Sequence, residues 1–269
     1  MSDLDPVART ARLTAALRAR ESERPDRLFS DVFAGRLAGE SARALADQLG
    51  EVPAIAVRTR FFDDLLTGIA GAGEGLLQFV LLAAGMDTRA QRLPFPAGTT
   101  LYEVDRPELL RLKDALLADV PEPVCRRVAV SADLAGDWPR SLAQAGFRPG
   151  LPTCWLVEGL TQYLQEADVI RLFDRITGCS APGSHLLAEF VAASVFRDAA
   201  ARPMLDALAE QGAVWHYGTD EPLSLFAERG WKAESVPYSE VGQAMGRWPQ
   251  ISAATPAPTA GGYLVHATR

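Results

Sequence analysis

The chain contains 269 residues, of which 48% are hydrophobic and 23% are charged, and its formal net charge is −7. This composition is that of a globular protein with a substantial core, and it excludes wholesale disorder. The negative charge disfavours nonspecific binding to nucleic acid, which needs cationic side chains against phosphates, and disfavours docking on an anionic membrane.

The cysteines and the N-terminus narrow the class further. Cys125, Cys154 and Cys179 are irregularly spaced, which indicates neither a disulfide framework nor a zinc-binding pair. Residues 1–26 contain several arginines but lack the apolar stretch of a secretory signal. No apolar run reaches the length of a membrane span. We therefore expect a soluble, cytoplasmic protein without a bound metal.

The first 72 residues predict only helices. Apolar residues recur at helical spacing in 6–21, 36–49 and 53–70. In the third of these helices Arg58 and Arg60 alternate with apolar residues, and we expect Arg58 to lie on the exposed face. The helical segment is expected either to cover a ligand site on the rest of the chain or to form a homodimer contact.

From residue 73 the pattern changes to short apolar strands that alternate with amphipathic helices. The predicted strands are 76–85, 100–105, 127–131, 153–158 and 184–190, and the predicted helices between them are 107–117, 139–145 and 165–177. Alternation at this spacing predicts an α/β fold with a Rossmann-like, doubly wound and mostly parallel sheet.

The C-terminal part departs from that alternation. Two final strands, 234–238 and 262–267, are expected to form an antiparallel pair at one edge, which brings the sheet to about seven strands. We expect a single domain, 1–269, made of a helical cover (1–72), a ligand-binding core (73–190), a helical substrate or lid segment (191–233) and terminal strands (234–269).

Polar residues stand at the carboxyl ends of the predicted strands, where open α/β sheets bind ligands. In chain order they are Ala84-Gly85-Met86-Asp87-Thr88-Arg89, then Glu103 and Asp105, then Asp133 and Leu134, then Glu158. Gly85 permits close approach of a ligand to the backbone, and an acid ending the second strand can accept both hydroxyls of a ribose. The first loop lacks G-x-G-x-x-G and carries an acid, which disfavours a pyrophosphate. The pattern therefore favours a phosphate-free nucleoside such as S-adenosylmethionine over NAD.

Several segments together resemble the leucine carboxyl methyltransferase family of class I methyltransferases. The matching segments, in order between about residues 7 and 190, are Arg58–Asp63 (an Arg-Thr-Arg element), Leu82–Arg89, Tyr102–Glu108 with Lys113, Ser131–Leu134 with Trp138, and Val157–Leu164. The resemblance implies that the chain binds S-adenosylmethionine and releases S-adenosylhomocysteine.

The resemblance also implies roles for the residues around the first loop. Arg60 is expected to pair with the methionine carboxylate of the cofactor in a charge-assisted contact. Ala84 and Gly85 pass beneath the methionyl part. Asp87 and Thr88 shape the loop.

The remaining roles fall on the later strands. Asp105 is expected to hold the ribose, with Glu103 supporting it. Asp133 and the backbone of Leu134 are expected to recognise adenine, although an Asp at position 133 also suits the N-cap of a short helix. Glu158 is expected to face the amino group of the cofactor.

The implied reaction is an in-line displacement at the sulfonium methyl group, and positioning supplies most of the rate. A carboxylate of a small molecule or peptide is the expected acceptor, because it is already ionised. A hydroxyl acceptor benefits from a general base, for which His185, His216 and Tyr217 are the candidates. The cations available to neutralise a carboxylate acceptor are Arg197, Arg202 and Arg247.

Other functions stay open at this point. A hydroxyl methyltransferase of secondary metabolism is one alternative. Ala83 stands where the family has its first glycine, which leaves room for a protein of this fold that uses the cofactor as a fixed positive charge in cyclase or lyase chemistry. A non-catalytic scaffold is a third alternative, and an NAD-dependent oxidoreductase is weaker for want of the glycine motif.

Overall fold

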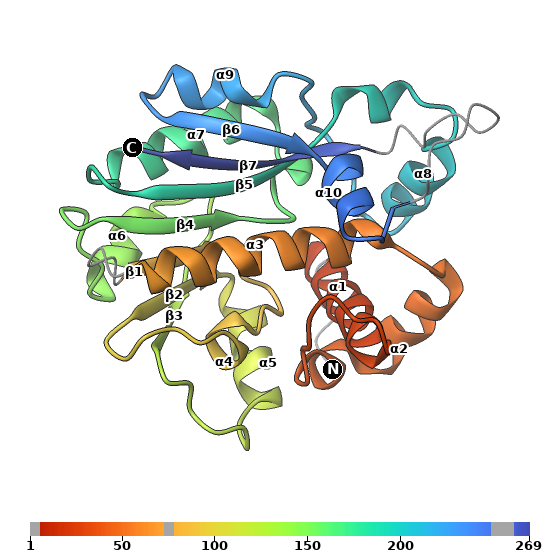
Figure 1. Ribbon diagram of the computed structural model, residues 1–269, viewed down its shortest axis with the longest axis horizontal. Coiled ribbons are helices and arrows are strands. Elements are labelled where there is room, and N and C mark those ends of the chain that lie inside the picture. The colour runs from red at the N-terminus through yellow and green to blue at the C-terminus, as the bar shows by residue number, and fades with distance from the viewer. Residues whose placement is uncertain (1–5, 73–77, 249–260) are drawn as a thin grey trace.

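The computed structural model describes residues 6–72, 78–248 and 261–269, which form a seven-stranded sheet in the order β3-β2-β1-β4-β5-β7-β6 (Figure 1). The strands are β1 (Gln78–Leu82), β2 (Thr100–Asp105), β3 (Arg126–Ser131), β4 (Thr153–Val157), β5 (His185–Val191), β6 (Lys232–Pro237) and β7 (Gly262–Thr268). Strands β1 to β5 pair in parallel. The predicted Rossmann-like α/β fold is confirmed.

The last two strands are antiparallel to one another, as predicted, but their order was not foreseen. β7 lies between β5 and β6 and is antiparallel to both. Sequence alternation reveals that a strand exists, while its place in the sheet depends on long-range pairing.

The helices are distributed over both faces and the carboxyl edge of the sheet. They are α1 (Pro6–Glu23), α2 (Ala34–Leu49), α3 (Pro53–Gly71), α4 (Arg89–Arg92), α5 (Pro107–Leu116), α6 (Trp138–Gln144), α7 (Glu166–Gly178), α8 (Arg202–Glu210), α9 (Pro222–Ala227) and α10 (Tyr238–Ala244), with 3₁₀ turns η1 (Thr161–Tyr163) and η2 (Ala193–Arg197). One apolar core lies between the sheet and α6, α7 and α9, and a second lies between the opposite face and α3, α4 and α10.

Local chemistry explains the elements that frame the carboxyl edge. β1 is buried at every position, as expected of a central parallel strand. It ends at Leu82 rather than at residue 85, because Ala83 (φ 54°) and Gly85 (φ 51°) turn the backbone into a loop. The first two residues of the predicted strand, 76 and 77, lie outside the described residues. α3 begins at Pro53, whose fixed φ suits the first turn of a helix.

The N-terminal helices lie at the carboxyl end of the parallel strands, while α3 runs along one face of the sheet (Figure 1). α2 is not the continuous helix expected over 36–49, because Gly39 interrupts it with φ 73° and ψ 168°. Arg12 of α1 fills that position, so that a Cβ on Gly39 would lie 1.9 Å from its Nη2 atom. Within the described ranges, no helix combines the length and apolarity needed to cross a membrane.

Candidate functional site

The loop after β1 and the end of β2 are joined directly. The Gly85 N–H donates to Oδ2 of Asp105 at 2.7 Å, and the Arg106 N–H donates to Oδ1 at 2.7 Å. Each carboxylate oxygen has two lone pairs, so both oxygens of Asp105 keep capacity to accept a ligand hydroxyl. Asp105 is 8% exposed, and burial raises the pKa of its carboxyl. The structure therefore brings the predicted ribose acid against the predicted cofactor loop.

The N-terminal segment covers this loop. A Cβ on Gly85 would lie 3.1 Å from the Cβ of Ala11 on α1, which leaves little room for any larger residue than glycine. Arg18 of α1 donates to the Met86 carbonyl at 2.6 Å, and the hydroxyl of Thr88 donates to Asp31 at 2.7 Å. Thr88 thus holds the loop to the N-terminal cover, while the N–H of Ala84 ties it to β2 by donating to the Val104 carbonyl at 3.2 Å.

Asp87 and Glu158 meet on one buried cation, Arg89. Its Nη1 atom lies 2.5 Å from Asp87 and 2.7 Å from Glu158, and its Nε atom lies 2.8 Å from Asp63. Burial acts to raise the pKa of Asp87, but Arg89 together with Lys113, Arg92 and Arg18 outweighs it, and the pKa is lowered to about 2. Burial likewise opposes ionisation of Glu158, whose pKa is lowered because Arg89 and Arg58 lie beside it. Both carboxylates are ionised at neutral pH.

Arg58 was expected on the exposed face of α3 and Arg60 at the cofactor, but in the structure Arg58 is the more buried of the two. Arg58 is 9% exposed, and it binds Glu158 through Nε at 2.9 Å and Glu189 through Nη1 at 2.7 Å. Arg60 has a side chain 44% exposed that pairs with Asp64 on its own helix. The interpretation of Arg58 as a surface residue is wrong, and Arg60 is held by Asp64 and by the Leu28 carbonyl, to which its Nη1 donates at 2.7 Å.

The acids of β2 and β3 differ in environment. Glu103 is fully buried and pairs with Lys113 at 2.8 Å and Arg127 at 2.8 Å, so it is committed to internal ion pairs. Asp133 is exposed, and its Oδ1 accepts the Ala135 N–H at 2.9 Å in a turn. Leu134 packs against the core beside it.

Two of the three candidate bases, His216 and Tyr217, lie near the carboxyl ends of β4 and β5, where the N–H groups of both donate to the Gln162 carbonyl. His185 is the first residue of β5 and lies at the amino ends of the parallel strands, away from the loop after β1. Its Nδ1 is 2.9 Å from Nε2 of His266. His216 is exposed. Burial raises the pKa of Tyr217, which packs against Phe190. The structure therefore contradicts a role for His185 beside the loop and leaves Tyr217 protonated at neutral pH.

Two residues that sequence reasoning missed complete the buried cluster. Glu189, near the end of β5, accepts the Gly159 N–H at 2.8 Å and the hydroxyl of Tyr238 on α10. A signal was present, because Glu189 is the single acid in the predicted strand 184–190 and follows three apolar residues. Tyr238 was expected to end a strand, but it begins α10.

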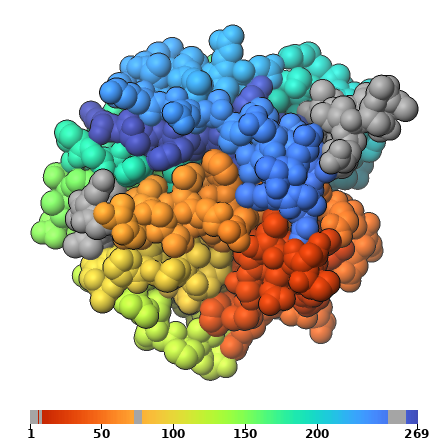
Figure 2. Space-filling model, viewed as in Figure 1, coloured from red at the N-terminus to blue at the C-terminus, as the bar shows by residue number. Residues whose placement is uncertain are grey.

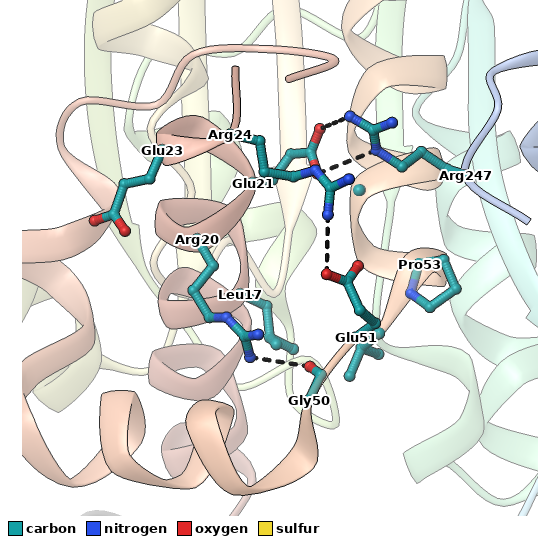
Figure 3. Close-up of a pocket in the computed structure, with 11 residues that line it drawn as sticks. Leu17, Arg20, Glu21, Glu23, Arg24, Gly50, Glu51, Pro53 and Arg247 are labelled. Atoms are coloured by element: carbon teal, nitrogen blue, oxygen red, sulfur yellow. Dashed lines mark hydrogen bonds and ion pairs between the residues drawn. The ribbon is translucent and has the colours of Figure 1, made fainter. Parts of the chain in front are cut away.

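A separate cavity of about 170 Å³ lies between α1, the start of α3 and Arg247 (Figure 3). Its cations are already bound: Arg20 donates to the Gly50 carbonyl at 2.9 Å, Arg24 pairs with Glu51 at 2.9 Å, and Arg247 pairs with Glu21 at 3.1 Å. The cavity contains none of the predicted cofactor residues, and its charges are satisfied internally.

Comparison with solved structures places the fold in a known class. The chain resembles the crystal structure of a DUF574 family protein from Streptomyces avermitilis with a TM-score of 0.62 and 17% identity, over 95% of this chain and 96% of that one. At this identity the likeness concerns the fold alone.

Sequence comparison identifies the family. The model of the leucine carboxyl methyltransferase family matches residues 11–177. Relatives described as a "putative S-adenosyl-L-methionine-dependent methyltransferase" include one from Frankia alni, 44% identical over 98% of this chain and 94% of the relative, and one from a Parafrankia strain, 42% identical over 98% and 87%. The chain belongs to the leucine carboxyl methyltransferase family.

Proposed function

We propose that this chain transfers the methyl group of S-adenosylmethionine to a carboxylate oxygen of a small molecule or peptide. Its family membership makes it an S-adenosylmethionine-dependent methyltransferase. The identity of the acceptor atom, a carboxylate oxygen, is what we propose in addition. The observation that carries the proposal is the contact between the Gly85 loop and Asp105 at the carboxyl edge, with the Arg58–Glu158 pair beside it.

The residues present fit a nucleoside with an amino-acid tail. Asp105 offers free lone pairs at the edge of a buried strand, which suits the two ribose hydroxyls. Glu158 is held ionised by two arginines, which suits an ammonium group. Arg58 is one of the two buried arginines that bind that carboxylate, and it is less enclosed than Arg89; we assign it, in place of Arg60, to the methionyl carboxylate. Asp133 and Leu134, at the end of β3, are assigned to adenine.

The chemistry of the site favours a carboxylate acceptor. Bound S-adenosylmethionine supplies an electrophilic methyl group on a positively charged sulfur. A hydroxyl acceptor needs a base, yet His185 lies at the far edge of the sheet, His216 is exposed and the pKa of Tyr217 is raised by burial. A carboxylate needs no deprotonation, so the residues of this chain have only to hold the acceptor oxygen in line and exclude water.

Calorimetric titration with S-adenosylmethionine and S-adenosylhomocysteine tests the cofactor site. Wild type is expected to bind both, and Asp105→Ala is expected to weaken both by about ten-fold or more, since two hydroxyl contacts disappear. Asp114→Asn, on the exposed side of α5, is the matched control and should bind as wild type does. A folded wild-type protein that binds neither compound contradicts the proposal.

The acceptor oxygen is tested by the product. Incubation with methyl-labelled S-adenosylmethionine and a panel of carboxylic acids and phenols should label the acids. Mild alkali then releases labelled methanol from a methyl ester but not from a methyl ether. Alkali-stable label would favour the hydroxyl methyltransferase, and chemical conversion of a test compound while the label stays on S-adenosylmethionine would favour cyclase or lyase chemistry.

A further inference from the structure

A continuous chain of buried ion pairs runs from the N-terminal cover to the end of β5. Its links are Arg18–Asp31, Arg92–Asp31, Arg92–Asp63, Arg89–Asp63, Arg89–Asp87, Arg89–Glu158, Arg58–Glu158 and Arg58–Glu189. Among the described residues, this series of ion pairs contains one carboxylate more than it contains guanidinium groups. The neighbouring cluster of Glu103 and Asp114 with Lys113 and Arg127 is balanced.

The unbalanced carboxylate lies at the terminal link. Asp31, Asp63 and Glu158 are each shared by two arginines. Asp87 pairs with Arg89 alone, but Lys113, Arg92 and Arg18 lie near enough to favour its charge. Glu189 has Arg58 as its one cationic partner in the described structure, and Arg58 is shared with Glu158. Its other contacts are neutral donors, the Gly159 N–H and the Tyr238 hydroxyl. Glu189 is 4% exposed, so water contributes little to the stability of its charge.

An uncompensated negative charge in a buried site stabilises a bound cation more than a neutral ligand of the same shape. S-adenosylmethionine has a sulfonium, an ammonium and a carboxylate, and its net charge is +1; loss of the methyl group leaves a neutral thioether and a net charge of zero. We propose that Glu189 is a specificity-determining residue whose charge favours binding of the cationic cofactor over its neutral product. This inference rests on the proposed function, because it requires the cofactor to bind beside Arg58 and Glu158.

The charge of Glu189 also sets how this preference varies with pH. Burial raises the pKa of Glu189, while Arg58 from α3, the Gly159 N–H after β4 and the Tyr238 hydroxyl of α10 oppose that rise and Glu158 adds to it. Protonation of Glu189 at lower pH removes the excess charge. The preference for the cationic ligand should therefore be large at alkaline pH and should decrease as the pH falls.

The test is calorimetry of Glu189→Gln with both ligands. The substitution keeps the shape and hydrogen-bonding capacity of the side chain and removes one charge. We expect affinity for S-adenosylmethionine to fall about ten-fold, the order expected for a unit charge acting over roughly 10 Å at an effective dielectric constant near 20. Affinity for S-adenosylhomocysteine should be unchanged. Asp114→Asn, which removes a carboxylate from the balanced cluster, should leave the ratio of the two affinities as in wild type.

A second variant separates charge from structure. Tyr238→Phe removes a donor to Glu189 but leaves its charge, so the pH at which the affinity ratio declines should move upward. Equal weakening of both ligands in Glu189→Gln, an unchanged ratio, or a Tyr238→Phe profile that superimposes on wild type would overturn the inference. Failure of wild type to bind either ligand would instead withdraw the proposed function on which it rests.

Discussion

At the scale of single residues, the Arg-Thr-Arg element shows how far sequence reasoning reaches. Arg58 and Arg60 are two positions apart, so their side chains point in directions roughly 200° apart around α3. Apolar residues surround both, with Val57, Phe62 and Leu66 on the sheet side and Phe61 and Leu65 elsewhere. The sequence predicted a cation here but not which arginine faces inward, because the apolar pattern of this helix is nearly continuous.

The two arginines should differ sharply in their effect on stability. Arg58→Ala leaves Glu158 and Glu189 buried with one cation fewer, so the free energy of unfolding should fall by about 3 kcal/mol or more. Arg60→Ala removes an exposed pair with Asp64 and one hydrogen bond to the Leu28 carbonyl, and should lower the free energy of unfolding by about 1 kcal/mol or less. Urea unfolding of both variants measures the difference, and similar losses would contradict the buried assignment of Arg58.

At the scale of elements, the strands and main helices of the core followed from apolar periodicity, but features set by long-range contacts did not. The helical spacing of Tyr238 and Val241 in α10 was obscured because the preceding residues alternate as a strand. The same limit applies to His185: the sequence places it in a strand, but only pairing with β7 shows that it stacks on His266, with ring centroids 5.2 Å apart.

This histidine pair predicts a pH dependence of stability. Burial, followed by the charge of His185, lowers the pKa of His266 below its ordinary value. The unfolded chain therefore takes up the proton more readily, and the free energy of unfolding should decrease as the pH falls below about 6.5 toward the lowered value. Urea midpoints of wild type and His266→Gln, measured at about pH 8 and about pH 5.5, should show a smaller decrease in the variant. An identical decrease in both would assign the effect to other groups.

At the scale of the whole molecule, the N-terminal cover and the C-terminal helix meet over the carboxyl edge of the sheet. Figure 2 shows α10 packed against the N-terminal region on this face, where Arg247 pairs with Glu21 at 3.1 Å and Asp26 at 3.1 Å. Sequence reasoning left a cover over the ligand site and a homodimer contact as alternatives for the N-terminal segment, and it offered Arg247 as a contact for the acceptor. In the structure this residue joins the segment after α10 to the end of α1 and the turn that follows it.

That link should control how firmly α1 is held. Arg247→Ala removes the ion pairs to Glu21 and Asp26, so amide hydrogens of α1 should exchange faster while those of α7, on the opposite face, keep the wild-type rate. Hydrogen–deuterium exchange followed by mass spectrometry measures both helices in one experiment. Arg197→Ala, which removes an exposed pair with Asp220, is the control, and equal acceleration in the two variants would contradict the role of Arg247.

The position of β7 has a consequence for the order in which the protein is assembled during synthesis. β7 pairs with both β5 and β6, yet it emerges from the ribosome after both of them. Until residues 262–268 have been made, β5 has an unpaired edge and β6 has no neighbour in the sheet. Exposed strand edges recruit other chains, so the nascent protein carries an aggregation-prone edge on β5 until β7 has been made and can pair with it.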